Sequence, residues 1–226
     1  MALTIGVVVG LVQIFANDAY SGIKDRLWPT VKGTEVINYA PVNNGHLATG
    51  ISIGKTGSGT CDREALITEG AAMRCSIKDQ GFEPCYWRDV KGDRDRYICV
   101  MSPWEKKAIQ VVIPEGWDTP GIEGPQIPKE ERGPWGVEVQ DPGNREKFYR
   151  CLAITGAAGS AGGEPTRYIC WNEHIDPWKD GYLDEAEVAA YGTEVERKTQ
   201  GPWMLPIAIV GGGSEVRRGA IRRVFL

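Results

Sequence analysis

The sequence predicts a mainly β protein with an N-terminal hydrophobic helix and short peripheral helices, in which the strands form two similar disulfide-braced β units. Three observations support this prediction. The 226-residue chain is 42% hydrophobic and 25% charged, an ordinary globular composition with enough surface to bury for one or two domains. Its six cysteines lie among short β-rich arms separated by Gly-rich turns. Its first 17 residues carry no charged side chain.

Residues 1–28 are expected to form a hydrophobic helix that serves as a membrane anchor or an assembly helix. The uncharged part would span about 25 Å as a helix, slightly less than the roughly 30 Å hydrocarbon core of a bilayer. An uncleaved anchor is the favoured interpretation. A cleaved signal peptide and a buried helix of a soluble protein are the alternatives, although a signal peptide would need a basic n-region that is absent here.

Four small or amide residues in this segment share one helical stripe. They are Gly6, Gly10, Gln13 and Asn17, spaced 4, 3 and 4 residues apart. Small side chains let two helix backbones approach, and amides in hydrocarbon seek a partner. The stripe therefore predicts a helix seam through which the chain forms a homo-oligomer, with coincidence in a Gly/Val-rich run as the alternative.

The six cysteines predict disulfide bonds and hence an oxidising, extracytoplasmic compartment. They are Cys61, Cys75, Cys85, Cys99, Cys151 and Cys170. None lies in a C-x-x-C motif, and two histidines are too few for a Cys/His zinc site. Sequence does not determine the pairing, but hairpin-like arms favour neighbours: 61 with 75, 85 with 99 and 151 with 170. Free buried thiols are the alternative.

Composition divides the rest of the chain into four parts. Residues 34–113 form the first β unit, residues 114–134 a Pro/Gly-rich linker or loop, residues 135–210 the second β unit, and residues 211–226 a Gly hinge with a basic tail. Both units contain Arg-Tyr-Ile-Cys followed by Pro-Trp, which points to a duplicated disulfide-bridged hairpin. Short helices are expected at residues 62–73 and 184–191.

The cysteine neighbourhoods carry a resemblance. Gly-Thr-Cys61, Ala-Ala-Met-Arg-Cys75, Glu-Pro-Cys85-Tyr and Ile-Cys99 resemble a group of uncharacterised, mostly actinobacterial, exported or membrane-anchored disulfide proteins. The later Trp-led strand, Cys151, the Gly-rich stretch and Tyr-Ile-Cys170 are similar to the rest of that family, so the resemblance covers about residues 34–210. It differs at Met73, Glu83 and Tyr86, where the family has Trp, Asp and Phe. The resemblance implies an extracytoplasmic disulfide protein, but it does not indicate any particular activity.

Several functions are disfavoured by the sequence. The formal net charge is −4 and no Lys/Arg-rich run occurs, which argues against a nucleic-acid partner. Nucleophilic catalysis would have to use His46 or His174, and no Gly-x-Ser-x-Gly elbow accompanies them. A non-enzymatic role is therefore expected.

One segment follows the calcium-binding loop pattern. Asp176, Asp180, Asp184 and Glu187 occupy loop positions 1, 5, 9 and 12, glycine occupies position 6, and the carbonyl of Tyr182 would be a further ligand. Trp178 at position 3 offers no side-chain oxygen, so any calcium affinity should be weak. The alternative is a Gly turn with an acidic helix start.

Together these features predict a non-catalytic structural or interaction module of the cell envelope, membrane-anchored or secreted, and self-associating through the N-terminal helix. Eight tryptophans, many beside Pro or Gly, also suit the apolar faces of sugars. A module that binds carbohydrate, with an envelope polysaccharide as partner, is thus the alternative, and a hydrolase is a distant one.

Overall fold

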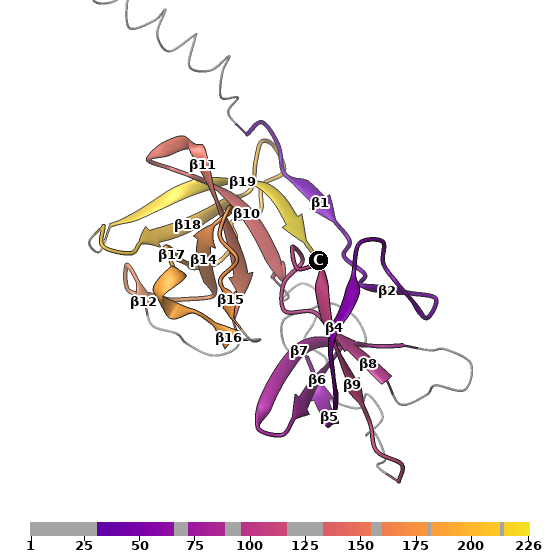
Figure 1. Cartoon of the computed structure of the whole chain (residues 1–226). Coiled ribbons are helices and arrows are strands. Elements are labelled where there is room, and N and C mark those ends of the chain that lie inside the picture. The colour runs from indigo at the N-terminus through magenta and orange to yellow at the C-terminus, as the bar shows by residue number, and fades with distance from the viewer. Residues whose placement is uncertain are drawn as a thin grey trace, which may run out of the picture.

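The computed structural model describes residues 31–65, 72–88, 96–116, 133–154, 160–179, 182–212 and 215–226. The regular structure of these residues is β-strand apart from one short 3-10 turn. Figure 1 shows the strands gathered into two bodies, one built from the first half of the chain and the other from the second, with the C-terminus between them. The mainly β prediction is confirmed.

The first body is a closed barrel. Its strands are β4 (Ser52–Ser58), β5 (Thr60–Glu64), β6 (Ala72–Ile77), β7 (Gln80–Trp87), β8 (Arg96–Cys99) and β9 (Lys107–Val112). They lie in the order β4-β9-β8-β7-β6-β5. Because β4 and β5 are one strand interrupted at a single residue, the two edges of this sheet are continuous in the chain and the sheet closes. As β4/β5, β6, β7, β8 and β9 alternate in direction, the closing pair of β4 and β9 is parallel.

Gly59 makes the bend between β4 and β5. A Cβ atom there would lie 2.0 Å from the carbonyl oxygen of Ser76 and 3.0 Å from Cγ1 of Val111. Ser76 belongs to β6 and Val111 to β9, so the corner lies between the two strands that close the barrel. Only glycine allows the backbones to approach this closely.

The second body is a barrel of six strands that follow one another along the chain. They are β10 (Gly136–Asp141), β11 (Asn144–Ala153), β14 (Tyr168–Asn172), β17 (Ala190–Gly192), β18 (Met204–Ile209) and β19 (Val216–Phe225). Each strand pairs with the next, and β19 returns to pair with β10. The even number of alternating strands makes this closing pair antiparallel. β1 (Glu35–Ile37) then adds to β19 in parallel.

A glycine again stands where the second barrel closes. Gly219 lies in β19, near the point where this strand passes from β18 to β10. A Cβ atom on Gly219 would lie 2.5 Å from both the carbonyl oxygen of Gln140 and Cγ2 of Val139. The two barrels therefore use the same device, a glycine corner in the strand that pairs on both sides.

Three two-stranded hairpins complete the described regular structure. They are β2 (Val42–Asn43) with β3 (His46–Leu47), β12 (Ser160–Ala161) with β13 (Glu164–Pro165), and β15 (Trp178–Lys179) with β16 (Tyr182–Leu183).

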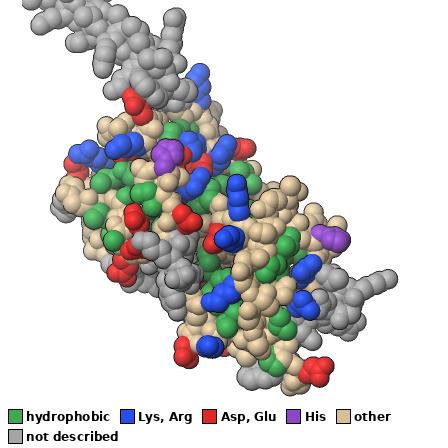
Figure 2. Space-filling model, viewed as in Figure 1, with side chains coloured by type: hydrophobic (Ala, Val, Ile, Leu, Met, Phe, Trp, Pro, Cys, Tyr) green, Lys and Arg blue, Asp and Glu red, His purple; other side chains and the backbone are tan. Residues whose placement is uncertain are grey.

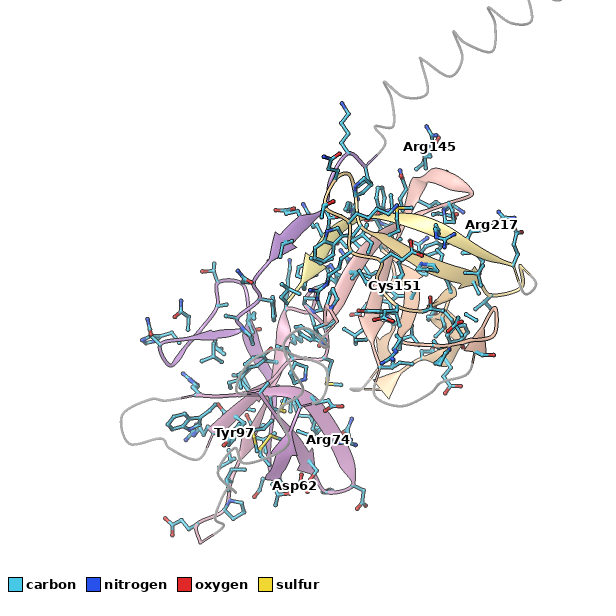
Figure 3. All side chains as sticks on the ribbon, turned by 180° about the vertical axis from the view of Figure 1, so that it is seen from behind. Asp62, Arg74, Tyr97, Arg145, Cys151 and Arg217 are labelled. Carbon is cyan, nitrogen blue, oxygen red and sulfur yellow. A yellow bond between two sulfur atoms is a disulfide. The ribbon has the colours of Figure 1, made fainter. Side chains whose placement is uncertain are left out.

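Each barrel is filled by side chains that alternate inward along its strands, and the disulfides lie among them. Cys61, Cys75, Cys85 and Cys99 are buried in the core of the first barrel with Phe82 and Val111. Cys151 and Cys170 are buried in the second with Val137, Leu205 and Ile221. Figure 3 shows the disulfide sulfurs of the first barrel near Tyr97, and Cys151 among the strands of the second.

A third apolar cluster joins the barrels through their outer faces. The first barrel contributes Ile98, Val100 and Ala108, and the second contributes Trp135, Leu152, Ile169 and Trp171. Ile98 and Ile169 occupy the same place in the two Arg-Tyr-Ile-Cys strands, so the two hairpins that share this motif pack against each other. Burial of these side chains supports a fixed arrangement of the two barrels.

The predicted helices require correction. Residues 62–73 were expected to be helical, but β5 and β6 take up most of the described part of this segment and pair with Cys61 opposite Cys75. Residues 184–191 contain only the 3-10 turn η2 (Glu185–Glu187), and β17 follows it. The helical pattern in each stretch is short, and the hydrogen bonds of strand pairing are favoured over it. In the first stretch, the Cys61–Cys75 disulfide across the two strands adds to this preference. No α-helix occurs in the part of the chain that the structure describes.

The expected N-terminal helix of residues 1–28, with the proposed seam of Gly6, Gly10, Gln13 and Asn17, lies outside the described residues. A search of the described residues finds no helix with the length and apolar character needed to cross a membrane.

The predicted C-terminal boundary is wrong. Residues 211–226 were expected to be a Gly hinge and a basic tail, but ten of them form β19, which pairs with three other strands. The arginines of β19 are on its more exposed positions, while Ile221 and Val224 are buried. The second unit therefore extends beyond residue 210. Most of the predicted linker at 114–134 lies outside the described residues.

Candidate functional site

The candidate site is a cleft at the junction of the two barrels. Each wall contains a segment that directly follows an Arg-Tyr-Ile-Cys strand: residues 102–107 after β8, and residues 173–177 after β14. The cleft has a volume of about 400 Å³. Its lining side chains include Trp104, Glu105, Lys106, Lys107, Arg150, Glu173, His174 and Asp176.

Trp104 fixes one wall of the cleft against the second barrel. Its indole N–H donates to Oε1 of Glu138 over 2.8 Å. Its ring meets those of Trp171 and Phe225 edge-on, with centroids 5.8 and 5.2 Å away. Gly136 makes room for this contact, because a Cβ atom there would lie 2.8 Å from Cγ of Pro103. A residue of the first barrel is thereby inserted into the outer face of the second.

Glu138 is a buried carboxylate at this junction, with a side-chain exposure of 2%. Arg222 donates to it over 2.8 Å, and Arg223 lies 3.5 Å and Arg150 3.7 Å from its oxygens. Arg222 also pairs with Glu173, and Arg223 with Glu35. Three arginines and three glutamates therefore balance in one network, which offsets the cost of burying a charge.

Glu105 is the cleft residue whose titration is most changed. Burial raises the pKa of its carboxyl from 4.5 to about 7, the N–H of Met101 opposes this by donating to the carboxylate, and the negative charge of Asp176 raises it further. Burial, with a smaller effect of Glu105, also raises the pKa of Tyr39 to about 12. The cleft therefore contains a carboxyl group that changes charge near neutral pH.

Several buried polar atoms near the junction have no hydrogen-bond partner. They are Oη of Tyr39, Nε1 of Trp135 and Nε of Arg150. Tyr39 and Trp135 pack together, with ring centroids 5.2 Å apart. Unpaired buried donors are rare in folded proteins, and they are usually satisfied by water or a ligand.

The disulfide prediction is confirmed. The structure has three bonds, Cys61–Cys75, Cys85–Cys99 and Cys151–Cys170, which are the pairs that neighbouring arms favour. Each joins residues that lie directly opposite one another on adjacent antiparallel strands. All six cysteines are described and none is free. Three disulfides fit an extracytoplasmic location.

The residues of the proposed calcium loop are distributed over different structures. Asp176 lines the cleft, Asp180 lies outside the described residues, and Tyr182 is in a strand of the hairpin β15–β16. The carboxylate of Asp184 accepts a hydrogen bond from the backbone N–H of Ala186 and so caps the turn that contains Glu187. Within the described residues, only Cys75, Cys85 and Cys99 meet the distance requirement for a shared metal ion, and all three are in disulfides. Calcium binding stays a prediction.

Sequence reasoning did not identify most cleft residues. Trp104 is the tryptophan of the first repeated Pro-Trp, whereas no sequence pattern singled out Glu105, Glu138 or Arg150. Glu138 stands between Val137 and Val139, which point into the core of the second barrel. Because side chains alternate along a strand, Glu138 is on the outer face, and in the second barrel alone it would be exposed to solvent. The signal that could have found the cleft is the repeat itself, because both of its walls follow the repeated motif.

Comparison with known proteins found no matching family model, no matching curated protein and no matching solved structure. The cleft therefore has to be interpreted from its own chemistry.

Proposed function

We propose that the protein is a non-catalytic binding module that acts outside the cytoplasm and holds an envelope carbohydrate in the cleft between its barrels. The observation that carries this proposal is the composition of the cleft, in which hydrogen-bond donors and acceptors face the same space beside a half-buried tryptophan. A binding cleft between two packed domains is a common place for a small ligand.

Sugar hydroxyls both donate and accept hydrogen bonds, so they suit a wall that offers both kinds of group. In the cleft, the carboxylates of Glu173 and Asp176 are acceptors, and the side chains of Lys106, Lys107 and Arg150 are donors. Charges of both signs are interspersed on the molecular face in Figure 2, without a large patch of one sign. A hydroxyl-rich ligand fits this mixture better than a uniformly charged polymer does.

The proposed location draws on the disulfides and on the resemblance to exported disulfide proteins. Three bonds in two barrels would be reduced or unnecessary in a reducing cytosol. Membrane anchoring and self-association through Gly6, Gly10, Gln13 and Asn17 belong to the same proposal. Gly10→Leu should weaken self-association, and Val9→Leu, on another helical face, should not.

Binding of the full-length protein to isolated cell-wall polysaccharide tests the ligand class. Asp176→Asn and Lys107→Gln should each reduce the bound fraction several-fold because each removes a charge from the cleft. Glu164→Gln, a substitution in the exposed hairpin β12–β13, is the matched control and should leave binding unchanged. Equal retention of wild type and cleft variants would contradict the proposed site.

Glycoside hydrolysis is a second candidate because of one observation. Glu105 has a pKa of about 7 and is influenced by the carboxylate of Asp176, and glycosidases use one protonated and one ionised carboxyl group. If the protein is a hydrolase, incubation with wall oligosaccharides releases new reducing ends and Glu105→Gln abolishes the release. Binding without release supports the non-catalytic module.

A further inference from the structure

Arg150 is a partly exposed cation in the wall of the cleft. It is on β11, its side chain is 31% exposed, and its guanidinium stands over the Trp104 ring at 5.5 Å from the centroid. Its Nε atom is buried and has no hydrogen-bond partner. Because Nε is buried, only the terminal N–H groups of the guanidinium can meet a ligand in the cleft.

Glu138 forms an ion pair with Arg150 without a hydrogen bond to its Nε atom. Oε1 of Glu138 lies 3.7 Å from Nε of Arg150, beyond hydrogen-bond length. That same oxygen already accepts the indole N–H of Trp104 at 2.8 Å, and Oε2 accepts from Arg222 at 2.8 Å. Glu138 therefore holds Arg150 in place electrostatically while its hydrogen bonds go to other residues.

We propose that Arg150 makes the cleft a receptor for a carboxylate, so that the ligand is an acidic sugar. This inference rests on the proposed function and names the class of carbohydrate. A guanidinium presents N–H groups in a planar fork that matches the two oxygens of a carboxylate. Lys106 and Lys107, both exposed at the cleft, add positive charge to its lining.

The rest of the cleft suits the neutral part of such a sugar. Asp176 and Glu105 offer carboxyl oxygens to hydroxyl groups, and the hydroxyl of Ser102 lies in the wall between the barrels. An acidic sugar places its carboxylate and its hydroxyls on one compact ring. One residue of it can therefore use both the cationic and the acidic side chains of this cleft.

Titration calorimetry of the full-length protein tests this inference with three probes. They are an oligogalacturonate, a neutral galactose oligomer of the same length, and an oligomer of glycerol phosphate. The acidic sugar should bind about tenfold more tightly than the neutral sugar, since one charge-assisted bidentate contact is gained. Its affinity should also fall with increasing salt, whereas that of the neutral sugar should not.

Variants at one position assign the effect to Arg150. Arg150→Gln should abolish the preference for the acidic sugar, and Arg150→Lys should keep only part of it because the fork is lost. Arg145, which is labelled in Figure 3, is an exposed arginine on the same strand as Arg150. Its substitution Arg145→Gln is the control and should keep the full preference for the acidic sugar.

The outcomes separate this inference from the proposed function. Equal, salt-independent binding of both sugars by the wild type would overturn the carboxylate assignment and leave the carbohydrate cleft in place. Preference for the glycerol phosphate oligomer would overturn it in favour of a phosphate site. Binding of none of the probes and no retention on cell-wall polysaccharide would overturn both. If Arg150→Gln does not fold, the wild-type preference and its salt dependence still test the carboxylate site, and Arg150→Lys assigns it to Arg150.

Discussion

Trp104 of the first barrel donates its indole N–H to the buried carboxylate of Glu138 in the second barrel, over 2.8 Å. This bond adds to the apolar contacts that hold the two bodies together. Trp104 also lines the cleft. The guanidinium of Arg150 lies over its ring, and Glu105 is the next residue in the chain. The proposed ligand cleft and the docking of the barrels therefore share one residue.

Substitution of Trp104 should loosen the junction in two steps. Trp104→Phe keeps an aromatic ring but removes the N–H, which should lower the free energy of unfolding by about 1–2 kcal/mol. Trp104→Ala also removes the ring contacts and should cost about 3–5 kcal/mol. Urea unfolding monitored by circular dichroism measures both. Unchanged stability of Trp104→Phe would show that the bond to Glu138 adds nothing.

Glu138→Gln should be strongly destabilising. The variant removes the negative charge shared by Arg222, Arg223 and Arg150, so partly buried cations lose their compensation, at a cost of about 3 kcal/mol. Glu215→Gln, which removes a fully exposed partner of Arg217, is the control and should leave the unfolding midpoint unchanged. A neutral result at Glu138 would mean that the arginines find other partners.

Local patterns predicted a large part of this fold. The side chains of the strands around the cysteines alternate inward and outward. Cysteines that are neighbours in the sequence lie on adjacent antiparallel strands, so the pairs predicted from the sequence are the disulfides that form. β19 was missed because its outer positions are arginines and a Gly run precedes it, features that are also typical of a tail. Its buried Ile221 and Val224 show the strand pattern only once its partners are known.

The candidate site could not be predicted in the same way. The cleft depends on how the outer faces of two barrels meet, and no periodicity within one strand contains that information. Glu138 illustrates the point, because its position in β10 is outward and its burial comes from Trp104, 34 residues earlier in the chain. The elevated pKa of Glu105 likewise comes mainly from burial, with a smaller effect of the charge on Asp176, and both arise only through the fold.

The glycine corners should be essential to barrel closure. Gly59→Ala would place a Cβ atom 2.0 Å from the Ser76 carbonyl, and Gly219→Ala would place one 2.5 Å from the Gln140 carbonyl. Each should cost at least about 2 kcal/mol, because backbone must move to relieve the overlap. Gly33→Ala, where nothing lies within 4 Å, is the control. Thermal unfolding of the three variants makes the comparison, and tolerance of Gly59→Ala would contradict the closed barrel.

Glu105 should make stability depend on pH. Its carboxyl has a pKa of about 7 in the folded protein against an ordinary 4.5, so the folded state binds more protons between these values. The contribution is complete below about pH 4.5, falls as the pH rises and is lost above about pH 7. Because the group is partly solvated, we expect about 1 kcal/mol between about pH 5 and pH 8. Urea unfolding of the wild type and of Glu105→Gln at these two pH values tests the prediction. If the free energy of unfolding changes equally with pH in both proteins, a group other than Glu105 is responsible.

Loss of Cys61 should cause disulfide exchange within the first barrel. The sulfur atoms of Cys75, Cys85 and Cys99 lie within 4.8 Å of one another. In Cys61→Ala the Cys75 thiolate can attack Cys85, forming a Cys75–Cys85 bond and releasing the Cys99 thiolate, or attack Cys99 and release Cys85. Peptide mapping under non-reducing conditions should therefore find a new bond to Cys75 beside Cys85–Cys99. In the control, Cys151→Ala, the pairs of the first barrel should stay unchanged, because Cys170 belongs to the core of the other barrel. A free Cys75 as the only product in Cys61→Ala would show that the barrel holds the sulfurs too rigidly for exchange.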